Sequence, residues 1–224
     1  MHYEEMLPYQ IDEVMREKPI AYLPWGALEW HGKHLAIGND ALKAHALCLG
    51  AAKRSGGVVL PPVWVGFETL GLRGFPHTLE FSEDVVRQLA SEYLTQLDKN
   101  GFKVIVLVTG HYGSPHVNAL KSVAERVGRR TKARIWVLPE YELTKEDIGY
   151  RGDHAGKWET SLLMHLRPEL VDMSQQPTDP QAKLEGVGGE DPRFHASPEL
   201  GRTAAEAIEE RLAKQALALL AEAE

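Results

Sequence analysis

Four residues of types that commonly bind metal ions follow one another closely in the first fifth of the chain. Glu29 and His31 are two positions apart, so their side chains point the same way in an extended segment. Asp40 precedes an expected helix, where an aspartate is also an ordinary helix cap. An imidazole together with two carboxylates suits Zn²⁺, Mn²⁺ or Fe²⁺. The segment therefore indicates a metal site, and His34 adds a fourth potential ligand.

A further candidate ligand, His111, follows the apolar run 103–109 and lies between Gly110 and Gly113. A histidine in such a turn is hard to explain by core packing, and loops often carry functional residues. The plainer alternative is that the two glycines form the turn and that the histidine has no role. The position in the loop favours a functional histidine.

The third cluster of side chains able to do chemistry contains His154 and Glu159. His154 lies in a glycine-bearing loop, and Glu159 lies in the first turn of an expected helix over 157–167. At that place the carboxylate of Glu159 could simply complement the helix dipole. With two other clusters at the same end of the expected sheet, a metal site with a nearby acid or base is the favoured interpretation.

The elements expected to position these residues alternate between strands and helices. Short apolar runs without polar alternation are typical of strands buried on both faces. The alternation predicts an α/β fold, a three-layer α/β/α sandwich with a mainly parallel sheet. Ligands of such sheets bind beyond the carboxyl ends of the strands, just after 24, 109 and 138. The expected strands cover 19–24, 57–65, 103–109 and 133–138, and the expected helices cover 40–54, 83–99, 115–130, 157–167 and 202–222.

The length and composition agree with one domain of this kind. The 224 residues are enough to bury a core and no linker divides them, so we expect a single domain over 1–224. Lys+Arg number 25 against 32 Asp+Glu, and the net charge of −7 argues against a nucleic-acid partner. The longest apolar runs are too short to span a membrane. The single cysteine, Cys48, and the lack of signal-peptide features favour the cytoplasm.

The three clusters together resemble the creatininase family of metal-dependent amidohydrolases. The family's first motif follows a strand, its second is a Gly-His turn, and its third reads His-Ala-Gly-x-x-Glu-Thr-Ser. The resemblance covers about 18 to 205, nearly the whole chain. The matching residues are Pro24, Gly26, Glu29, His31, Gly32, His34, Leu35 and Asp40, then Gly110 and His111, then His154, Ala155, Gly156, Glu159, Thr160 and Ser161.

The resemblance implies a site for two divalent metal ions, with Zn, Mn or Fe as candidates. Glu29, His31, Asp40 and His111 match ligand positions, and Asp40 would bridge the two metals. A metal pair of this kind polarises a carbonyl group and provides a hydroxide nucleophile near neutral pH. A nearby histidine can then protonate the leaving nitrogen, and His154 is the residue to which the resemblance gives that part.

One family ligand is missing from this chain. In the creatinine-cleaving members a glutamate that ligates the second metal occupies the place of Gly113. Either one metal binds, or a carboxylate from another element completes the set. Glu159 is the residue expected to close the site, and it is therefore assigned to both the metal site and the catalytic group.

Four further residues are expected to contact the substrate. His34 matches the first motif and is assigned to the substrate shell rather than to the ligands. Tyr112 matches the creatinine-cleaving members. Trp30 and Trp158 flank candidate ligands, so one of them would wall the pocket, although tryptophans more often pack in cores or interfaces.

The resemblance implies hydrolysis of a C–N amide bond in a small molecule, either a cyclic amide or a formamide. One alternative is hydrolytic opening of a carbocyclic ketone ring of the inosose type with the same metals. The other is a metal-binding α/β protein without catalysis, which the loss of a ligand at Gly113 favours. Family-type assembly implies a homo-oligomer, with a hexamer favoured, and the long turn-rich segment 174–198 is a candidate subunit contact.

Overall fold

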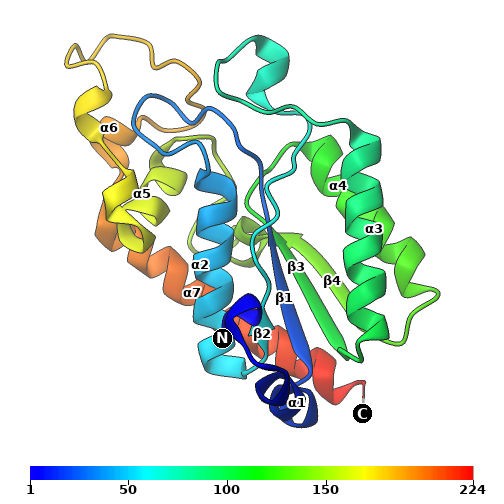
Figure 1. The fold of residues 1–224 in the computed structure, drawn as a ribbon. Coiled ribbons are helices and arrows are strands. Elements are labelled where there is room, and N and C mark those ends of the chain that lie inside the picture. The colour runs from blue at the N-terminus through cyan, green and yellow to red at the C-terminus, as the bar shows by residue number, and fades with distance from the viewer. Residues whose placement is uncertain (224) are drawn as a thin grey trace.

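A sheet of four parallel strands, with helices on both faces, forms the centre of the computed structural model, which describes residues 1–223 (Figure 1). The strand order is β2-β1-β3-β4, and every neighbouring pair is parallel. The expected three-layer α/β/α fold is confirmed. The strands are β1 (Ile20–Trp25), β2 (Val58–Val59), β3 (Val104–Thr109) and β4 (Arg134–Pro139).

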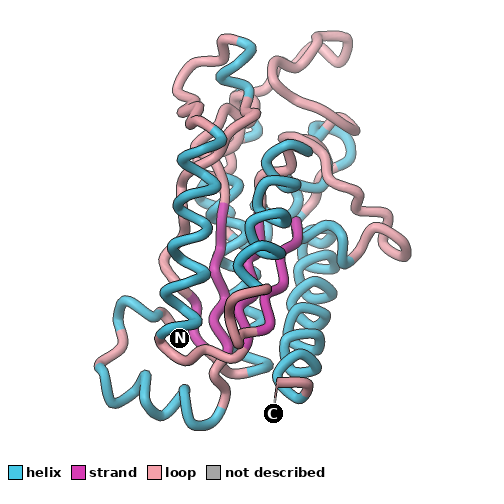
Figure 2. The backbone as a smooth tube through the Cα atoms, turned by 90° about the vertical axis from the view of Figure 1, so that its right-hand side faces the viewer, coloured by secondary structure: helices cyan, strands magenta, loops and turns pink. Residues whose placement is uncertain are grey.

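The helices divide between the two faces of the sheet, as the tube in Figure 2 shows. α3 and α4 cover one face, while α2, α5 and α7 cover the other. The α-helices are α1 (Pro8–Glu17), α2 (Asn39–Ser55), α3 (Glu83–Lys99), α4 (Ser114–Gly128), α5 (Lys157–Leu166), α6 (Pro192–His195) and α7 (Pro198–Ala221). Short 3-10 segments cover Tyr3–Glu5, Leu70–Arg73, Glu140–Leu143, Pro168–Leu170 and Met173–Gln175.

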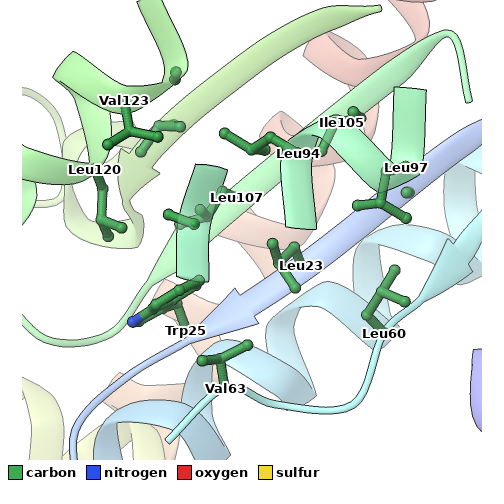
Figure 3. Close-up of a cluster of buried hydrophobic side chains, with 14 of the residues drawn as sticks. Leu23, Trp25, Leu60, Val63, Leu94, Leu97, Ile105, Leu107, Leu120 and Val123 are labelled. Atoms are coloured by element: carbon green, nitrogen blue, oxygen red, sulfur yellow. The ribbon is translucent and has the colours of Figure 1, made fainter. Parts of the chain in front are cut away.

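Every residue of β1 and β3 is buried, which explains why these strands lack polar alternation. Side chains of a strand alternate between its faces, so neighbouring residues enter different cores. Leu23 and Leu107 pack with Leu94 and Leu120 from α3 and α4 (Figure 3). The intervening residues of the same strands, such as Val106, pack against α2 and α7.

The second strand is much shorter than the expected run over 57–65. The backbone from Leu60 to Val63 still follows β1, since Leu60 N–H donates to the carbonyl of Tyr22 and Val63 N–H to that of Pro24. Pro61 and Pro62 between them have no N–H to donate. The ladder therefore ends after two residues, and the rest continues as loop.

The helix ends differ from expectation mainly at the two termini. α1 was not expected from the sequence, and Val14 is its one buried residue. α7 begins at Pro198, with the Ser197 hydroxyl accepting from Leu200 N–H, and not at 202. None of the helices among residues 1–223 is long and apolar enough to cross a membrane.

The long loops gather at the end of the sheet where the strands terminate, at the top of Figure 1. Segment 174–198 packs back onto the chain there and contains α6. Gly188 and His154 exchange two backbone hydrogen bonds of 2.7 and 2.9 Å, and the Glu185 carbonyl accepts from the indole of Trp30 at 3.2 Å. The loop thus holds one of the candidate catalytic residues.

The contact between α5 and α7 depends on a glycine. A Cβ on Gly201 would lie 1.8 Å from the carbonyl oxygen of Ser161, a rigid backbone atom. We expect Gly201→Ala to lower the free energy of unfolding by about 3 kcal/mol, at the upper end of overpacking costs. Gly128→Ala at the end of α4 is the matched control, because its Cβ would meet no atom within 4 Å. That control is expected to gain up to about 1 kcal/mol from helix propensity. Urea denaturation of both variants tests the difference, and equal stabilities would refute it.

Candidate metal centre

Asp40 lies at the meeting point of the site because two glycines let the first turn of α2 approach the strand ends. A Cβ on Gly26, just after β1, would lie 2.6 Å from the Cβ of Asp40. A Cβ on Gly110, just after β3, would lie 2.2 Å from the carbonyl oxygen of Asp40. Any other residue at either position would push α2 away, so these glycines place a buried carboxylate between two strands.

The two carboxylate oxygens of Asp40 face two different groups of side chains. Oδ2 lies 3.3 Å from Nδ1 of His111, which is also 2.9 Å from Oε2 of Glu29. Oδ1 lies 2.8 Å from Nε2 of His31, which is 3.4 Å from Oε2 of Glu159. Within each group the candidate ligand atoms lie within 4.8 Å of one another. The groups Glu29–Asp40–His111 and His31–Asp40–Glu159 are called here the first and second ligand groups.

Backbone carbonyls orient both imidazoles toward these groups. Nδ1 of His31 lies 2.9 Å from the carbonyl oxygen of Glu29, and Nε2 of His111 lies 2.9 Å from that of Phe67. A ring nitrogen that donates to a carbonyl must carry its proton, so the other nitrogen presents a lone pair in the neutral ring. In both residues that other nitrogen faces Asp40.

The buried atoms of the two groups fit a divalent cation. When the two imidazoles are neutral, Oε2 of Glu29, Nε2 of His31 and Oδ1 of Asp40 have no hydrogen bond, although buried polar atoms almost always have one. Carboxylate oxygens and imidazole nitrogens are ligands of Zn²⁺, Mn²⁺ and Fe²⁺. A cation would give each of these atoms the partner that the protein does not supply.

Protons and metal ions compete for the two imidazoles. Burial alone would lower the pKa of His31, but the carboxylates of Asp40 and Glu159 raise it to about 9. Burial would also lower the pKa of His111, but its hydrogen bonds to Asp40 and Glu29 raise it to about 10. Since ligands must be deprotonated to bind a metal, a bound cation would displace these protons.

A pocket of about 270 Å³ opens beside the ligand groups. His154 lines it, with its ring stacked on that of His31 at 4.2 Å between centroids. Nε2 of His154 lies 2.8 Å from the carbonyl oxygen of Trp30. Burial and the neighbouring His31 lower the pKa of His154, so the neutral ring holds its proton on Nε2 and leaves Nδ1 free.

The structure brings together all six residues expected to bind metal or do acid–base chemistry, from four separate segments. Of the residues expected to contact the substrate, Tyr112 lines the pocket. The segment after β3 delivers both Tyr112 and His111, while α5 delivers Glu159. The six residues are Glu29, His31, Asp40, His111, His154 and Glu159.

Three residues expected at the substrate lie elsewhere: the wall of this pocket, as far as residues 1–223 form it, does not include His34, Trp30 or Trp158. His34 Nε2 lies 2.9 Å from the Thr160 hydroxyl, and its Nδ1 contacts the amide of Gln176, so neither nitrogen is free. The indole of Trp30 packs on Phe75, and that of Trp158 stacks on Tyr150. Their contacts are those of packing residues, and their assignment to the substrate stays a prediction.

Two buried charges next to the ligand groups were not expected from the sequence. Lys43, on α2, donates to the Gly110 carbonyl at 2.7 Å and contacts Oε1 of Glu159. Glu140 follows β4, and burial raises its pKa to about 6. The signals existed: Lys43 interrupts the apolar stripe of its helix, and Glu140 lies at a strand end just after 138.

Asp153 is another pocket residue without an expected role, and it is half-buried. Its carboxylate accepts the N–H groups of Trp158 and Glu159, at 2.8 and 3.1 Å, and so caps the start of α5. Burial, followed by the nearby charge of Glu159, raises the pKa of Asp153 to about 7. The cap fixes the first turn of α5, which positions Glu159 in the second ligand group.

Because position 113 is a glycine, it supplies no carboxylate to the second ligand group. A Cβ there would lie 3.1 Å from Nε2 of His111 and 3.2 Å from the carbonyl oxygen of Glu68, so the space is tight but not closed. Glu159 approaches from α5, with Oε2 accepting the Ala155 N–H at 2.7 Å. The second group is therefore complete without position 113.

Comparisons with known proteins identify the family of this chain. The family model for creatininase, described as creatinine amidohydrolase, matches residues 4–218. Creatinine amidohydrolase from Pseudomonas putida is 28% identical over 182 residues, which cover 73% of this chain and 70% of that enzyme. The mycofactocin precursor peptide peptidase of Mycolicibacterium smegmatis is 30% identical over 162 residues, 68% of this chain and 60% of that protein. A solved Zn–Zn form of a creatininase mutant superposes with a TM-score of 0.79 at 24% identity, covering 96% of both chains. This chain belongs to the creatininase family of hydrolases.

Proposed function

We propose that this protein is a metal-dependent amidohydrolase that cleaves a C–N amide bond of a small molecule, a cyclic amide or a formamide. The observation that carries the proposal is the placement of Asp40, whose two oxygens serve two ligand groups beside one pocket. Family membership supports the hydrolytic reaction. The pocket, of about 270 Å³, has room for a small substrate only.

The metal complement that we propose is two divalent ions, with Zn²⁺, Mn²⁺ or Fe²⁺ as candidates. Glu29 and His111 would hold one, His31 and Glu159 the other, and Asp40 would bridge them. The unsatisfied buried ligand atoms and the Zn–Zn form of the related creatininase support this complement. When bound, such a pair polarises a carbonyl group and lowers the pKa of a water to near neutrality.

His154 is proposed to carry the proton that the departing nitrogen needs. Its Nε2 proton is committed to the Trp30 carbonyl, so Nδ1 is the atom that takes up and returns a proton. The lowered pKa keeps this nitrogen free to accept a proton at neutral pH. Tyr112, which lines the same pocket, would contact the substrate.

We further propose that residues 1–224 form one catalytic domain and that the protein is a cytoplasmic homo-oligomer, with a hexamer favoured. A single buried cysteine, Cys48, is compatible with a reducing compartment. Many residues of segment 174–198 are exposed, which is compatible with a contact to a neighbouring subunit. Light scattering decides, because a species of 25.0 kDa would exclude the assembly.

The reaction is tested with a substrate panel of lactams, linear formamides and inososes, offered to protein loaded with zinc, manganese or iron. We expect an amide of the panel to give a carboxylate and an amine, and chelation to abolish the activity. Turnover of inososes alone would show that the bond assignment is wrong. Protein that binds metal but turns over no compound would favour a binding role.

The bridging role of Asp40 predicts a difference in metal content between two variants. Asp40→Ala removes the carboxylate that both ligand groups share, so we expect it to lose most of both metals. His34→Ala removes a histidine of the same motif that belongs to neither group, and it should keep its metals. Elemental analysis of the purified proteins measures both contents. Full occupancy in Asp40→Ala would exclude the bridge.

The role of His154 predicts loss of turnover without loss of metal. General acid–base groups contribute roughly 10²- to 10⁴-fold to a rate, so His154→Ala should lose about that much in kcat. Since its side chain lies within ligand distance of Glu29 and His31, metal content must be measured in the same preparation. Metal lost together with activity would make His154 a ligand, and unchanged activity would give the proton transfer to another group.

A further inference from the structure

A positive charge is buried inside the candidate metal centre. Lys43 lies one turn after Asp40 on α2, and its side chain is fully buried. Its ammonium donates to the Gly110 carbonyl at 2.7 Å and to Oε1 of Glu159. Oε1 of Glu140 is 3.6 Å away. A buried lysine with this many acceptors is held in one position as a fixed cation.

Beside the ammonium, three side chains contact one another: Tyr112, Tyr150 and Glu140. The ring of Tyr112 lies under Nζ of Lys43 at 4.3 Å, and its hydroxyl donates to Glu140. Tyr150 also contacts the Tyr112 hydroxyl and lies 3.5 Å from the carboxylate of Glu140. Glu140 is thus the anion that balances Lys43 on the side away from the ligand groups.

Lys43 acts on the two ligand groups unequally. Its Nζ is 3.7 Å from Oδ1 of Asp40, the oxygen that faces His31, and it occupies one oxygen of Glu159. Glu159 belongs to the second group alone, whereas Asp40 is shared and turns its other oxygen toward the first group. In the first group, the ion pairs of Glu29 within residues 1–223 involve His111 alone. The ammonium, which a metal ion would not displace, therefore lies closer to the oxygens of the second group than to those of the first.

We propose that Lys43 makes the metal centre asymmetric: the first ligand group binds its divalent ion tightly, and the second binds its ion weakly and exchangeably. The ammonium repels a dication a few ångströms away and takes up Oε1 of Glu159, which leaves the metal only Oε2, the oxygen that also accepts the Ala155 N–H. This inference rests on the proposed metal centre and deepens it. Loading of the second position then depends on the metal concentration around the protein.

A competing effect of Lys43 has the opposite sign. The ammonium also holds Glu159 in position, and a freed side chain would bind metal less well. However, Oε2 of Glu159 accepts the N–H of Ala155 at 2.7 Å without help from Lys43. The positioning effect is therefore the smaller one, and the repulsion between a buried ammonium and a dication dominates.

The test is a metal titration of wild type and Lys43→Met with Zn²⁺ against a competing chelator. Wild type should bind one ion tightly and a second at least about tenfold more weakly. Met fills nearly the same volume without charge, so Lys43→Met should tighten the second ion about tenfold or more and leave the first unchanged. Lys53→Met, an exposed lysine on the same helix, is the matched control and should change neither affinity.

A second pair of variants covers the possibility that Lys43→Met does not fold. Glu140→Gln removes the balancing anion but keeps an acceptor for Tyr112, and it should weaken the second ion because the ammonium is then less compensated. The double variant Lys43→Met/Glu140→Gln removes one charge of each sign and should still bind the second ion more tightly than Glu140→Gln does. Opposite shifts in the two single variants are expected of a charge effect and not of a structural one.

The outcomes separate this inference from the proposed function, because the titration needs no substrate. Two ions of equal affinity in wild type, or a second ion that weakens in Lys43→Met, would overturn the asymmetry and leave the metal centre intact. A wild-type protein that binds no metal would overturn the metal centre, and with it both proposals.

Discussion

The close approach of α2 to the ends of β1 and β3 is the constraint on which the site depends. Because Gly26 and Gly110 have no Cβ, the first turn of α2 reaches between two strands. Asp40 therefore lies at the edge of the sheet, where one of its oxygens faces His31 and the other faces His111. Glu29 and His111 come from the loops that follow the same two strands. A single backbone contact thus determines where three ligand candidates meet.

The second consequence of that contact is a concentration of buried charge. Asp40, Glu29 and Glu159 are all at most 2% exposed, and carboxylates buried in this way are costly unless cations balance them. In the protein without metal, protons on the histidines and the ammonium of Lys43 supply that balance. Metal ions would replace the protons but not the ammonium. Metal binding would therefore stabilise the fold, while the ammonium that stays in place would limit the affinity for the metal.

The sequence identified the residues that the structure brings together around Asp40 but not the charges beside them, for a physical reason. Glu29, His31 and Asp40 are close in the chain, and the rule that parallel strands end at one edge brings His111 to them. Lys43 and Glu140 are 97 positions apart, and they form an ion pair only because the fold brings Lys43 of α2 to the residue that follows β4. The place of His34 in a motif likewise did not reveal that Thr160 and Gln176 contact its ring nitrogens.

The proposed acid–base residue is positioned differently from the proposed ligands, and this difference bears on how one framework can serve several substrates. Loops hold His154: two backbone hydrogen bonds join it to Gly188, and its Nε2 donates to the carbonyl of Trp30. The ligands depend instead on strand ends and helix starts. A change in segment 174–198 would therefore move the proton carrier and reshape the region above the pocket while leaving Asp40 and its partners in place. Because specificity follows such loop contacts, the metal framework can be retained while the bond that is cleaved changes.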